Sequence, residues 1–522
     1  MRKEAFRVRD TTHKKVLRRK RRIDKRLGKR RWRSQPRPML CAANVHYEVA
    51  DRTRGLGCGG IGAIHLLARH TGLIDAIDDK VRVLKAHLPY HESDHVLSIA
   101  YNALAGGTCL EHLERLRGDE SFLDALGAQR IPDPTTAGDF CRRFQNEEQV
   151  LTLMEAINAV RVKVWRQQPP EFFKQAVIDA DGTITPTTGK CKAGMNISYD
   201  GQWGYHPLLI SLANTREPLY LLNRSANRPS HERADEYLDK AIGLCRRGGF
   251  QRILLRGDTD FMQTWKLDEW DAAGDVTFIF GADARRPMIT RAQELLPESW
   301  RRLERPARYQ VKTQPRARPD NVKEQIVRQK EFKNYVLQWE DVAEFQHRPD
   351  LCAKSYRMIV LRKKISVEKG QEKLFEEYRY FFYITNDPAG TAEQIVYGAN
   401  DRCDQENLIA QLKDGGTGSM RNPLDNLHSN WAYMVMSSLA WTLKAWCGLL
   451  LPAEPGRWRQ RHRQEGRSIV RMEFATFVNG LMRLACQIVK SGRRIIYRLL
   501  SWNPWVTPLL RLAKAMRQPM RC

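Results

Sequence analysis

The chain has 522 residues, enough for two to four domains with a sizeable core. Its 87 Lys and Arg residues against 60 Asp and Glu residues give a net charge of +27, which points to a polyanionic partner such as nucleic acid. The eleven cysteines form no C-x-x-C pair, which argues against a zinc site, and their odd number favours reduced, intracellular thiols. The start of the chain has no apolar segment typical of a signal peptide.

The first 40 residues hold much of the excess charge. Residues 1–40 contain 18 basic and 3 acidic residues, a net charge of +15, and few apolar positions to bury. We predict a flexible basic arm that becomes helical on a phosphate backbone and binds it without reading sequence. A tail that only aids solubility is the alternative. The candidate DNA contacts in this arm are Arg18, Arg19, Lys20, Arg21 and Arg22.

Residues 41–165 show mainly helical patterns and are predicted to form a helical DNA-binding domain. A glycine-rich segment at residues 54–62 matches G-x-G-x-x-G, but no second strand follows, so a loop before a helix is favoured over a dinucleotide site. Residues 93–116 are compatible with either a helix-turn-helix or an ordinary helical hairpin. A further helix is predicted with Thr136 as its N-cap, and its Arg142 and Arg143 are candidate DNA contacts.

From residue 176 the pattern changes to strands that end in carboxylates. The strand starting at Ala176 ends with Asp179 and Asp181, which lie two residues apart and therefore on one face. A second buried strand, residues 252–258, ends in Asp258. Because an unpaired carboxylate in a core strand is costly, a divalent metal is a natural partner. We place Asp181 as the metal ligand and keep Asp179 as a reserve candidate or a supporting group.

A helix predicted over residues 401–413 adds a third carboxylate. At 100° per residue, Arg402, Glu406 and Lys413 fall within about 60° of one another, so one face presents two cations and a carboxylate. Taken alone, this pattern is typical of a surface ion-pair ladder. Together with the two strand-end carboxylates it indicates a shared site above one sheet.

The three carboxylates Asp181, Asp258 and Glu406 are the predicted catalytic residues. Hard cations such as Mg²⁺ or Mn²⁺ prefer oxygen ligands, and two of them suit phosphoryl transfer. Arg402 and Lys413 are predicted to hold phosphates rather than metal. His206 is expected to be structural or to face DNA.

The order of strands and helices predicts an α/β fold, with a mixed sheet covered by helices. The long apolar segment from Trp431 to Leu451 is interrupted by polar residues, so we expect a buried core helix and no membrane span. The predicted parts are the arm at 1–40, the helical domain at 41–165, the catalytic core at 170–283, a β-rich insertion at 284–390, the helix of Glu406 and the helix after it at 391–450, and a basic helical region at 451–522.

These residues resemble the DDE transposases of bacterial insertion sequences. Asp181-Gly-Thr183 resembles the D-x-T of their first strand, and the segment from Leu255 to Phe261 resembles the end of their second. Arg402-x3-Glu406-x6-Lys413 matches the last three members of their Y-R-E-K signature, while the Tyr position is Ala399 here. The resemblance implies an RNase H-like catalytic core with a β-rich insertion before the helix of Glu406.

The resemblance also implies a function, namely cut-and-paste transposition of double-stranded DNA. Such an enzyme binds inverted-repeat ends, hydrolyses a strand at each end with Mg²⁺ or Mn²⁺, and uses the freed 3′-OH to attack target DNA. A homodimer that pairs two ends, in the bacterial cytoplasm and associated with the nucleoid, is expected. Two alternatives remain at this point: an RNase H-like DNA nuclease without strand transfer, and a non-catalytic DNA-binding regulator.

Overall fold

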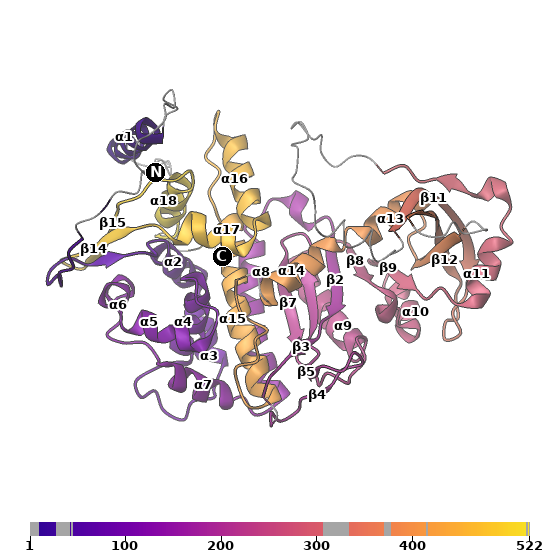
Figure 1. Ribbon diagram of the computed structural model, residues 1–522, viewed down its shortest axis with the longest axis horizontal. Helices are drawn as coiled ribbons and strands as arrows, with labels where there is room; N and C mark the ends of the chain where they lie inside the picture. Colours follow the sequence, from indigo (N-terminus) through magenta and orange to yellow (C-terminus); the bar gives the residue numbers. More distant parts are fainter. Residues whose placement is uncertain are drawn as a thin grey trace.

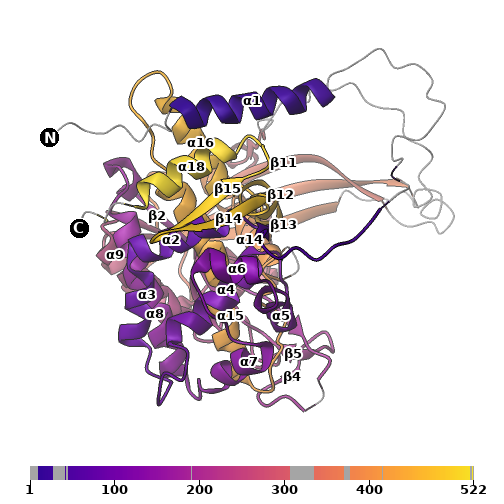
Figure 2. The same ribbon diagram turned by 90° about the vertical axis from the view of Figure 1, so that its left-hand side faces the viewer.

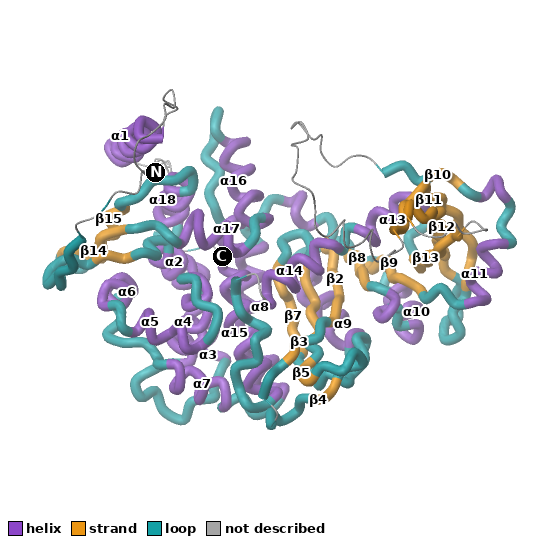
Figure 3. The backbone as a smooth tube through the Cα atoms, viewed as in Figure 1, coloured by secondary structure: helices purple, strands orange, loops and turns teal. Residues whose placement is uncertain are grey.

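The structure is arranged as three parts side by side, with a long mixed sheet linking the centre to one end (Figures 1 and 3). The N-terminal and C-terminal helices lie together on one side, and the carboxylate strands occupy the middle. The structure is a computed structural model, and it describes residues 10–27, 42, 45–189, 191–305, 334–369, 377–413, 416–517 and 520.

The central sheet has nine strands in the order β10-β11-β12-β13-β9-β8-β2-β6-β7. In its middle, β2 pairs in parallel with β8 and antiparallel with β6, and β8 pairs in parallel with β9. Numbered along the chain, the five core strands are ordered 3-2-1-4-5 with the second strand antiparallel, which is the RNase H-like arrangement predicted from the resemblance. These strands are β2 (Ala176–Gly182), β6 (Leu208–Leu212), β7 (Glu217–Leu222), β8 (Ile253–Gly257) and β9 (Val276–Ala282).

The β-rich insertion continues this sheet instead of forming a separate one. Its last strand, β13, pairs antiparallel with β9 of the core, and β12, β11 and β10 follow outward. The predicted strands are therefore present, and they lengthen the core sheet at its edge. The elements are α11 (Arg286–Gln293), β10 (Arg301–Arg302), β11 (Asn334–His347), β12 (Tyr356–Lys369) and β13 (Glu377–Thr385).

Helices cover the sheet, and one of them runs through the core of the molecule. The predicted core helix is α15, and nearly all of its residues are buried between the sheet and the helices α4, α8 and α16. Within the described part of the chain, no helix is long and apolar enough to cross a membrane. The helices around the sheet are α8 (Glu147–Trp165), α9 (Ala234–Gly248), α10 (Thr264–Ala272), α13 (Ala392–Asn400), α14 (Cys403–Lys413) and α15 (Leu427–Leu449).

The N-terminal helices pack against α15, favour one of the two alternatives that the sequence left open for residues 93–116, and correct one predicted N-cap. α4 is buried along almost its whole length and α5 has only five residues, so this pair packs as core structure rather than as a reading head in the manner of a helix-turn-helix. The N-cap of α7 is Asp133, not Thr136, because Pro134 occupies the first helical position and the Asp133 carboxylate accepts from the Thr136 amide. The helices are α2 (Ile61–Thr71), α3 (Leu73–Lys80), α4 (Glu92–Leu104), α5 (Leu113–Arg117), α6 (Glu120–Leu126) and α7 (Pro134–Arg142).

The C-terminal region was expected to be helical, but it also contains a β-hairpin that binds the N-terminal domain. β14 pairs with β15 and with the short strand β1, so the two ends of the chain share one sheet. Alternation in the segment QIVKSGRRIIYRL is the signal that the helical prediction missed. The elements are β1 (Gly55–Leu56), α16 (Arg459–Arg471), α17 (Phe474–Phe477), β14 (Cys486–Ser491), β15 (Arg494–Leu499) and α18 (Val506–Ala515).

The glycine-rich segment that matched a dinucleotide motif is a packing site for this C-terminal region. The amide of Gly59 donates to the carbonyl of Leu484 at 2.8 Å, and that of Gly60 donates to Met482. A Cβ atom on Gly60 would lie 2.1 Å from the carbonyl oxygen of Leu481. Glycine is therefore required here by the close approach of two backbones, which confirms the preference for a loop before a helix.

Part of the predicted basic arm is a helix that lies on the C-terminal region. α1 (Asp10–Leu27) runs beside α18 (Figures 1 and 2), where Val16 packs against the cluster that contains Val506 and Leu509. The side chains of Thr12, Val16, Arg19 and Ile23 form one half-buried stripe along it, and Arg19 donates to the carbonyl of Leu499. The neighbouring cations on the other faces are exposed. The rest of the predicted arm lies outside the described residues.

Candidate catalytic site

The candidate site lies at the edge of the sheet where two neighbouring parallel strands end. β2 and β8 are paired so that Asp179 is opposite Arg256. Asp181 and Asp258 each come two residues later, and they therefore emerge at the same level from adjacent strands. The sheet register, which no single motif encodes, brings together two carboxylates 77 residues apart in sequence.

The two carboxylates converge on a single cationic atom. Nη2 of Arg402 lies 3.7 Å from Oδ2 of Asp181 and 3.6 Å from Oδ2 of Asp258. The side chains of Arg402 and Asp181 are 12% and 15% exposed, whereas that of Asp258 is 43% exposed. Asp258 is also the N-cap of a short 3₁₀ turn, where it accepts from the amide of Asp260.

Burial makes both carboxylates harder to ionise. Burial raises the pKa of Asp181 to about 7, the guanidinium of Arg402 opposes this rise, and the charges of Asp258 and Glu406 add to it. The pKa of Asp258 is also raised, mainly by burial, while Arg402 again lowers it. A cation at this edge of the sheet therefore favours the ionised form of both carboxylates.

Asp179, the reserve candidate, lies in a different environment. It is almost fully buried and accepts two hydrogen bonds from Arg256, at 2.7 Å from Nε and 2.8 Å from Nη2. The remaining terminal nitrogen of Arg256 donates to the carbonyl of Gly398 in α13. Asp179 thus ties β2 to β8 and, through Arg256, to the segment that precedes Arg402.

The third predicted carboxylate is on α14, which packs across β2. Gln405 is buried and donates to the carbonyl of Leu209, which fixes the helix on the sheet. Glu406 is the next residue and is exposed, and its charge acts on Asp181. Lys413, two turns later, donates to Thr183 Oγ1 at 3.0 Å and to the carbonyl of Ile184 at 2.6 Å. Arg402 itself lies in the turn before α14 begins at Cys403.

The residues fit a hard divalent cation by their chemistry, although they are not assembled around one. Among the described residues, no three His, Cys, Asp or Glu side chains lie close enough to hold a metal ion together. Two carboxylates from adjacent strands nevertheless point at one cation, and oxygen ligands of this kind are what Mg²⁺ and Mn²⁺ prefer. The guanidinium of Arg402 is the cation that they contact in this structure.

Comparison with protein families gives a clear result. Residues 57–521 match the family described as "Transposase DDE domain group 1". The chain belongs to this family. DDE transposases are DNA transposases that generally use divalent metals.

Two other comparisons add little to the family result. No curated protein matches the sequence. Among solved structures, a piggyBac transposase in a synaptic complex with hairpin DNA matches over 82% of each chain, with 10% sequence identity and a TM-score of 0.31. A score this low supports no argument about the present chain.

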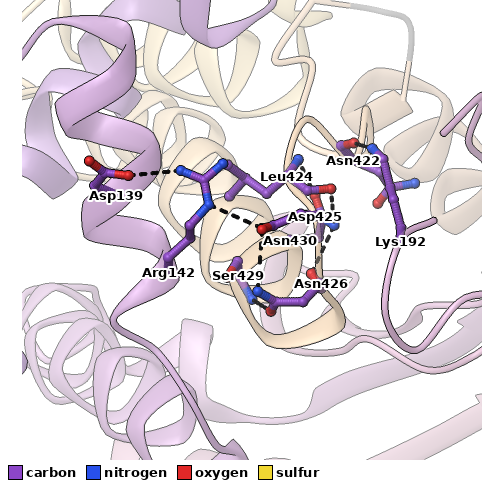
Figure 4. Close-up of polar contacts among 9 residues, drawn as sticks. All are labelled: Asp139, Arg142, Lys192, Asn422, Leu424, Asp425, Asn426, Ser429 and Asn430. Carbon is purple, nitrogen blue, oxygen red and sulfur yellow. Dashed lines mark hydrogen bonds and ion pairs between the residues drawn. The ribbon is translucent and has the colours of Figure 1, made fainter.

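The predicted DNA-contacting side chains differ in whether they are already bound to other groups of the protein. Arg142 is engaged within the protein, since it pairs with Asp139 at 2.9 Å and with Asp425 at 3.1 Å (Figure 4). The pair with Asp139 lies within α7, whereas the pair with Asp425 joins α7 to the loop before α15, where Lys192 also donates to the carbonyl of Asn422. Arg143 is exposed. In α1, Arg18, Lys20, Arg21 and Arg22 are exposed, whereas Arg19 faces the C-terminal region.

One residue near the site was given no catalytic role by the sequence. The ring of His206 lies against Gly182, directly after Asp181, and a Cβ on Gly182 would be 2.8 Å from its Nε2. His206 Nδ1 donates to the carbonyl of Arg228 at 2.9 Å, so Nε2 is free of a proton in the neutral ring. Burial lowers the pKa of His206, which favours that neutral form. The signal in the sequence is the glycine of D-G-T, which leaves room for the ring.

Proposed function

We propose that this chain is the transposase of a bacterial insertion sequence, acting by cut-and-paste transposition. It binds the inverted-repeat ends of its element, cleaves DNA by two-metal hydrolysis and joins the 3′-OH end to target DNA. The observation that supports this best is the convergence of Asp181 and Asp258 on one cation at the end of adjacent parallel strands. Membership of a DDE transposase family gives that pair its chemical context.

In this proposal the carboxylates of Asp181, Asp258 and Glu406 hold Mg²⁺ or Mn²⁺. The chemistry that such a metal would supply there is activation of the attacking water or hydroxyl and stabilisation of the leaving oxygen. The protein contributes rigid placement, because Asp181 and Asp258 are on paired strands and Glu406 is on a helix fixed by Gln405. Arg402 and Lys413 supply positive charge for DNA phosphates.

The proposed partner is double-stranded DNA, which is also held by surfaces outside the carboxylate site. The outward cations of α1 and the exposed Arg143 are the proposed phosphate contacts. α1 lies on a C-terminal region that is itself rich in arginine, so two basic segments adjoin and a polyanion relieves their mutual repulsion. A homodimer that pairs two ends, acting at the nucleoid of a bacterial cytoplasm, completes the proposal.

The test uses two variants, Asp258→Ala and Glu406→Ala, on a duplex that ends in the element's inverted repeat. Each is expected to lower strand cleavage in Mg²⁺ or Mn²⁺ more than about a hundredfold, because a metal ligand is lost. Binding of the duplex, followed by fluorescence anisotropy, is expected to stay within about twofold of wild type. Asp260→Ala, an exposed carboxylate two residues from Asp258, is the matched control and is expected to cleave normally.

Full cleavage by either variant would refute the site. Joining of the cleaved 3′ end to a second duplex separates a transposase from a nuclease of the same fold. Cleavage without joining would therefore favour the nuclease. Binding without any metal-dependent cleavage by the wild-type protein would favour a regulator.

A further inference from the structure

The guanidinium of Arg402 is held at the site by charge rather than by hydrogen bonds to the carboxylates. Its Nη2 is 3.7 Å from Asp181 and 3.6 Å from Asp258, both beyond hydrogen-bonding distance. The buried Nε of Arg402 has no hydrogen-bond partner among the residues that the structure describes. By contrast, Arg256 makes two short hydrogen bonds to Asp179 in the same sheet.

We propose that Arg402 competes with the divalent metal for Asp181 and Asp258, and that DNA relieves this competition. The proposal rests on the proposed function, since it concerns the same carboxylates. In the DNA-free protein the guanidinium supplies the positive charge that two neighbouring carboxylates need. An arginine side chain is not deprotonated in proteins, so it releases the carboxylates only by moving.

The position of Arg402 in the chain lowers the free-energy cost of moving its side chain. It lies in the turn between α13 and α14, where its backbone carbonyl accepts from the amide of Gln405 at 2.8 Å. The backbone is thereby fixed at the start of α14, while the side chain has long contacts and an unsatisfied Nε. Rotation of the side chain therefore breaks no short hydrogen bond to the carboxylates.

A DNA phosphate is the natural alternative partner for this guanidinium. Arginine binds phosphate with two parallel hydrogen bonds, which is a better geometry than one nitrogen shared at 3.6–3.7 Å. A divalent cation at the carboxylates would also repel the guanidinium. DNA binding and metal binding are therefore expected to favour each other, so that the metal is retained only when a strand is present to be cut.

The test measures binding of Mn²⁺ alone, by electron paramagnetic resonance of the free ion, with no catalysis involved. Arg402→Gln is expected to bind Mn²⁺ at least about tenfold more tightly than wild type, or ~1.4 kcal/mol, in the absence of DNA. Lys413→Gln also removes one positive charge near the site, from a side chain that donates to Thr183 Oγ1 and to the carbonyl of Ile184. This control is expected to change Mn²⁺ affinity less than about threefold.

Adding an uncleavable duplex is expected to tighten Mn²⁺ binding by the wild-type protein and to have little effect on Arg402→Gln. Equal or weaker Mn²⁺ binding by Arg402→Gln would overturn the competition, as would an equal effect of Lys413→Gln.

Asp181→Asn separates the proposed metal site from the proposed competition. If it abolishes Mn²⁺ binding while Arg402→Gln changes nothing, the metal site stands and the competition fails. If Asp181→Asn leaves Mn²⁺ binding unchanged, the proposed metal site itself fails.

Discussion

Carboxylate–arginine arrangements in the central sheet differ in how many hydrogen bonds the carboxylate accepts, and the two extremes are Glu217 and the pair Asp181 and Asp258. Glu217, at the start of β7, is fully buried and forms a closed cluster. One oxygen accepts from Arg161 at 3.0 Å and from the indole of Trp446 at 2.8 Å, and the other accepts from Trp165 and Thr215. All four hydrogen bonds to Glu217 are 3.0 Å or shorter, and the cluster joins α8 and α15 to the sheet.

The arrangement of Asp181 and Asp258 with Arg402 is open by comparison. Two carboxylates share one nitrogen at distances beyond hydrogen bonding, and Asp258 is partly exposed. The buried pair of Asp179 and Arg256 is closed, although it adjoins the open site. A carboxylate whose oxygens accept short hydrogen bonds within the protein stabilises the fold. A carboxylate without such bonds keeps lone pairs available to a ligand. This difference supports the proposal that Asp181, rather than Asp179, is the metal ligand.

The largest effect is expected from opening the closed cluster. Glu217→Ala leaves the Arg161 charge buried without its counter-ion and removes the acceptor of two buried indole N–H groups, which is expected to lower the free energy of unfolding by about 3–5 kcal/mol. Chemical denaturation measures this change. Asp258→Ala, at the open site, is expected to change it by less than about 1 kcal/mol. A Glu217→Ala protein as stable as wild type would end the distinction between the two arrangements.

The catalytic part of the fold was largely predictable from the sequence. Apolar runs that end in Asp181 and Asp258 indicated buried strands, and the spacing of Glu406 and Lys413 indicated one helix face. The nine-stranded mixed sheet and the buried helix α15 confirm the fold predicted from those patterns. What the sequence could not supply was the register of β2 against β8, because it depends on contacts between segments far apart in the chain.

Other features were missed because they depend on partners distant in sequence. Nothing local indicates that the glycines at 59 and 60 receive the carbonyls of Leu484 and Met482, or that β14 pairs with β1. Arg402 was predicted as part of a helix face that holds phosphates. Its contact with both carboxylates follows from the turn between α13 and α14, which helical periodicity does not describe.

A buried lysine in α15 provides an intermediate test, because its charge has no carboxylate partner among the described residues. Lys444 is fully buried, its Nζ donates to the carbonyl of Val470 at 2.9 Å, and it lies 3.8 Å from the centre of the Trp441 ring. Burial lowers the pKa of Lys444 to about 7. In the unfolded chain its pKa is about 10.4, so between these values the unfolded state binds more protons and stability rises with pH.

Replacement of this lysine is therefore expected to stabilise the protein most at low pH. Lys444→Met is expected to gain about 2 kcal/mol at and below pH ~7, after loss of the hydrogen bond to Val470, and this gain fades as pH approaches ~10. Denaturation midpoints at about pH 7 and pH 9.5 measure the difference. Lys174→Met, at an exposed lysine, is the control and is expected to show no such pH dependence. A gain that is constant across this range would show that Lys444 is not buried with a depressed pKa.

The smallest expected effect distinguishes two adjacent exposed arginines, of which Arg142 forms ion pairs within the described part of the protein. Arg142 already pairs with Asp139 and Asp425 (Figure 4), so its charge is largely committed within the protein. If Arg143 contacts a DNA phosphate as proposed, Arg143→Ala lowers the slope of log affinity against log salt by about 0.9, the value for one released counterion. Arg142→Ala is expected to change that slope by less than half as much and to cost below about 1 kcal/mol of stability. Binding isotherms of a duplex at several salt concentrations measure both slopes.

A larger change for Arg142→Ala than for Arg143→Ala would mean that the ion pairs with Asp139 and Asp425 open on DNA. Engagement within the free protein would then be no guide to function on this surface.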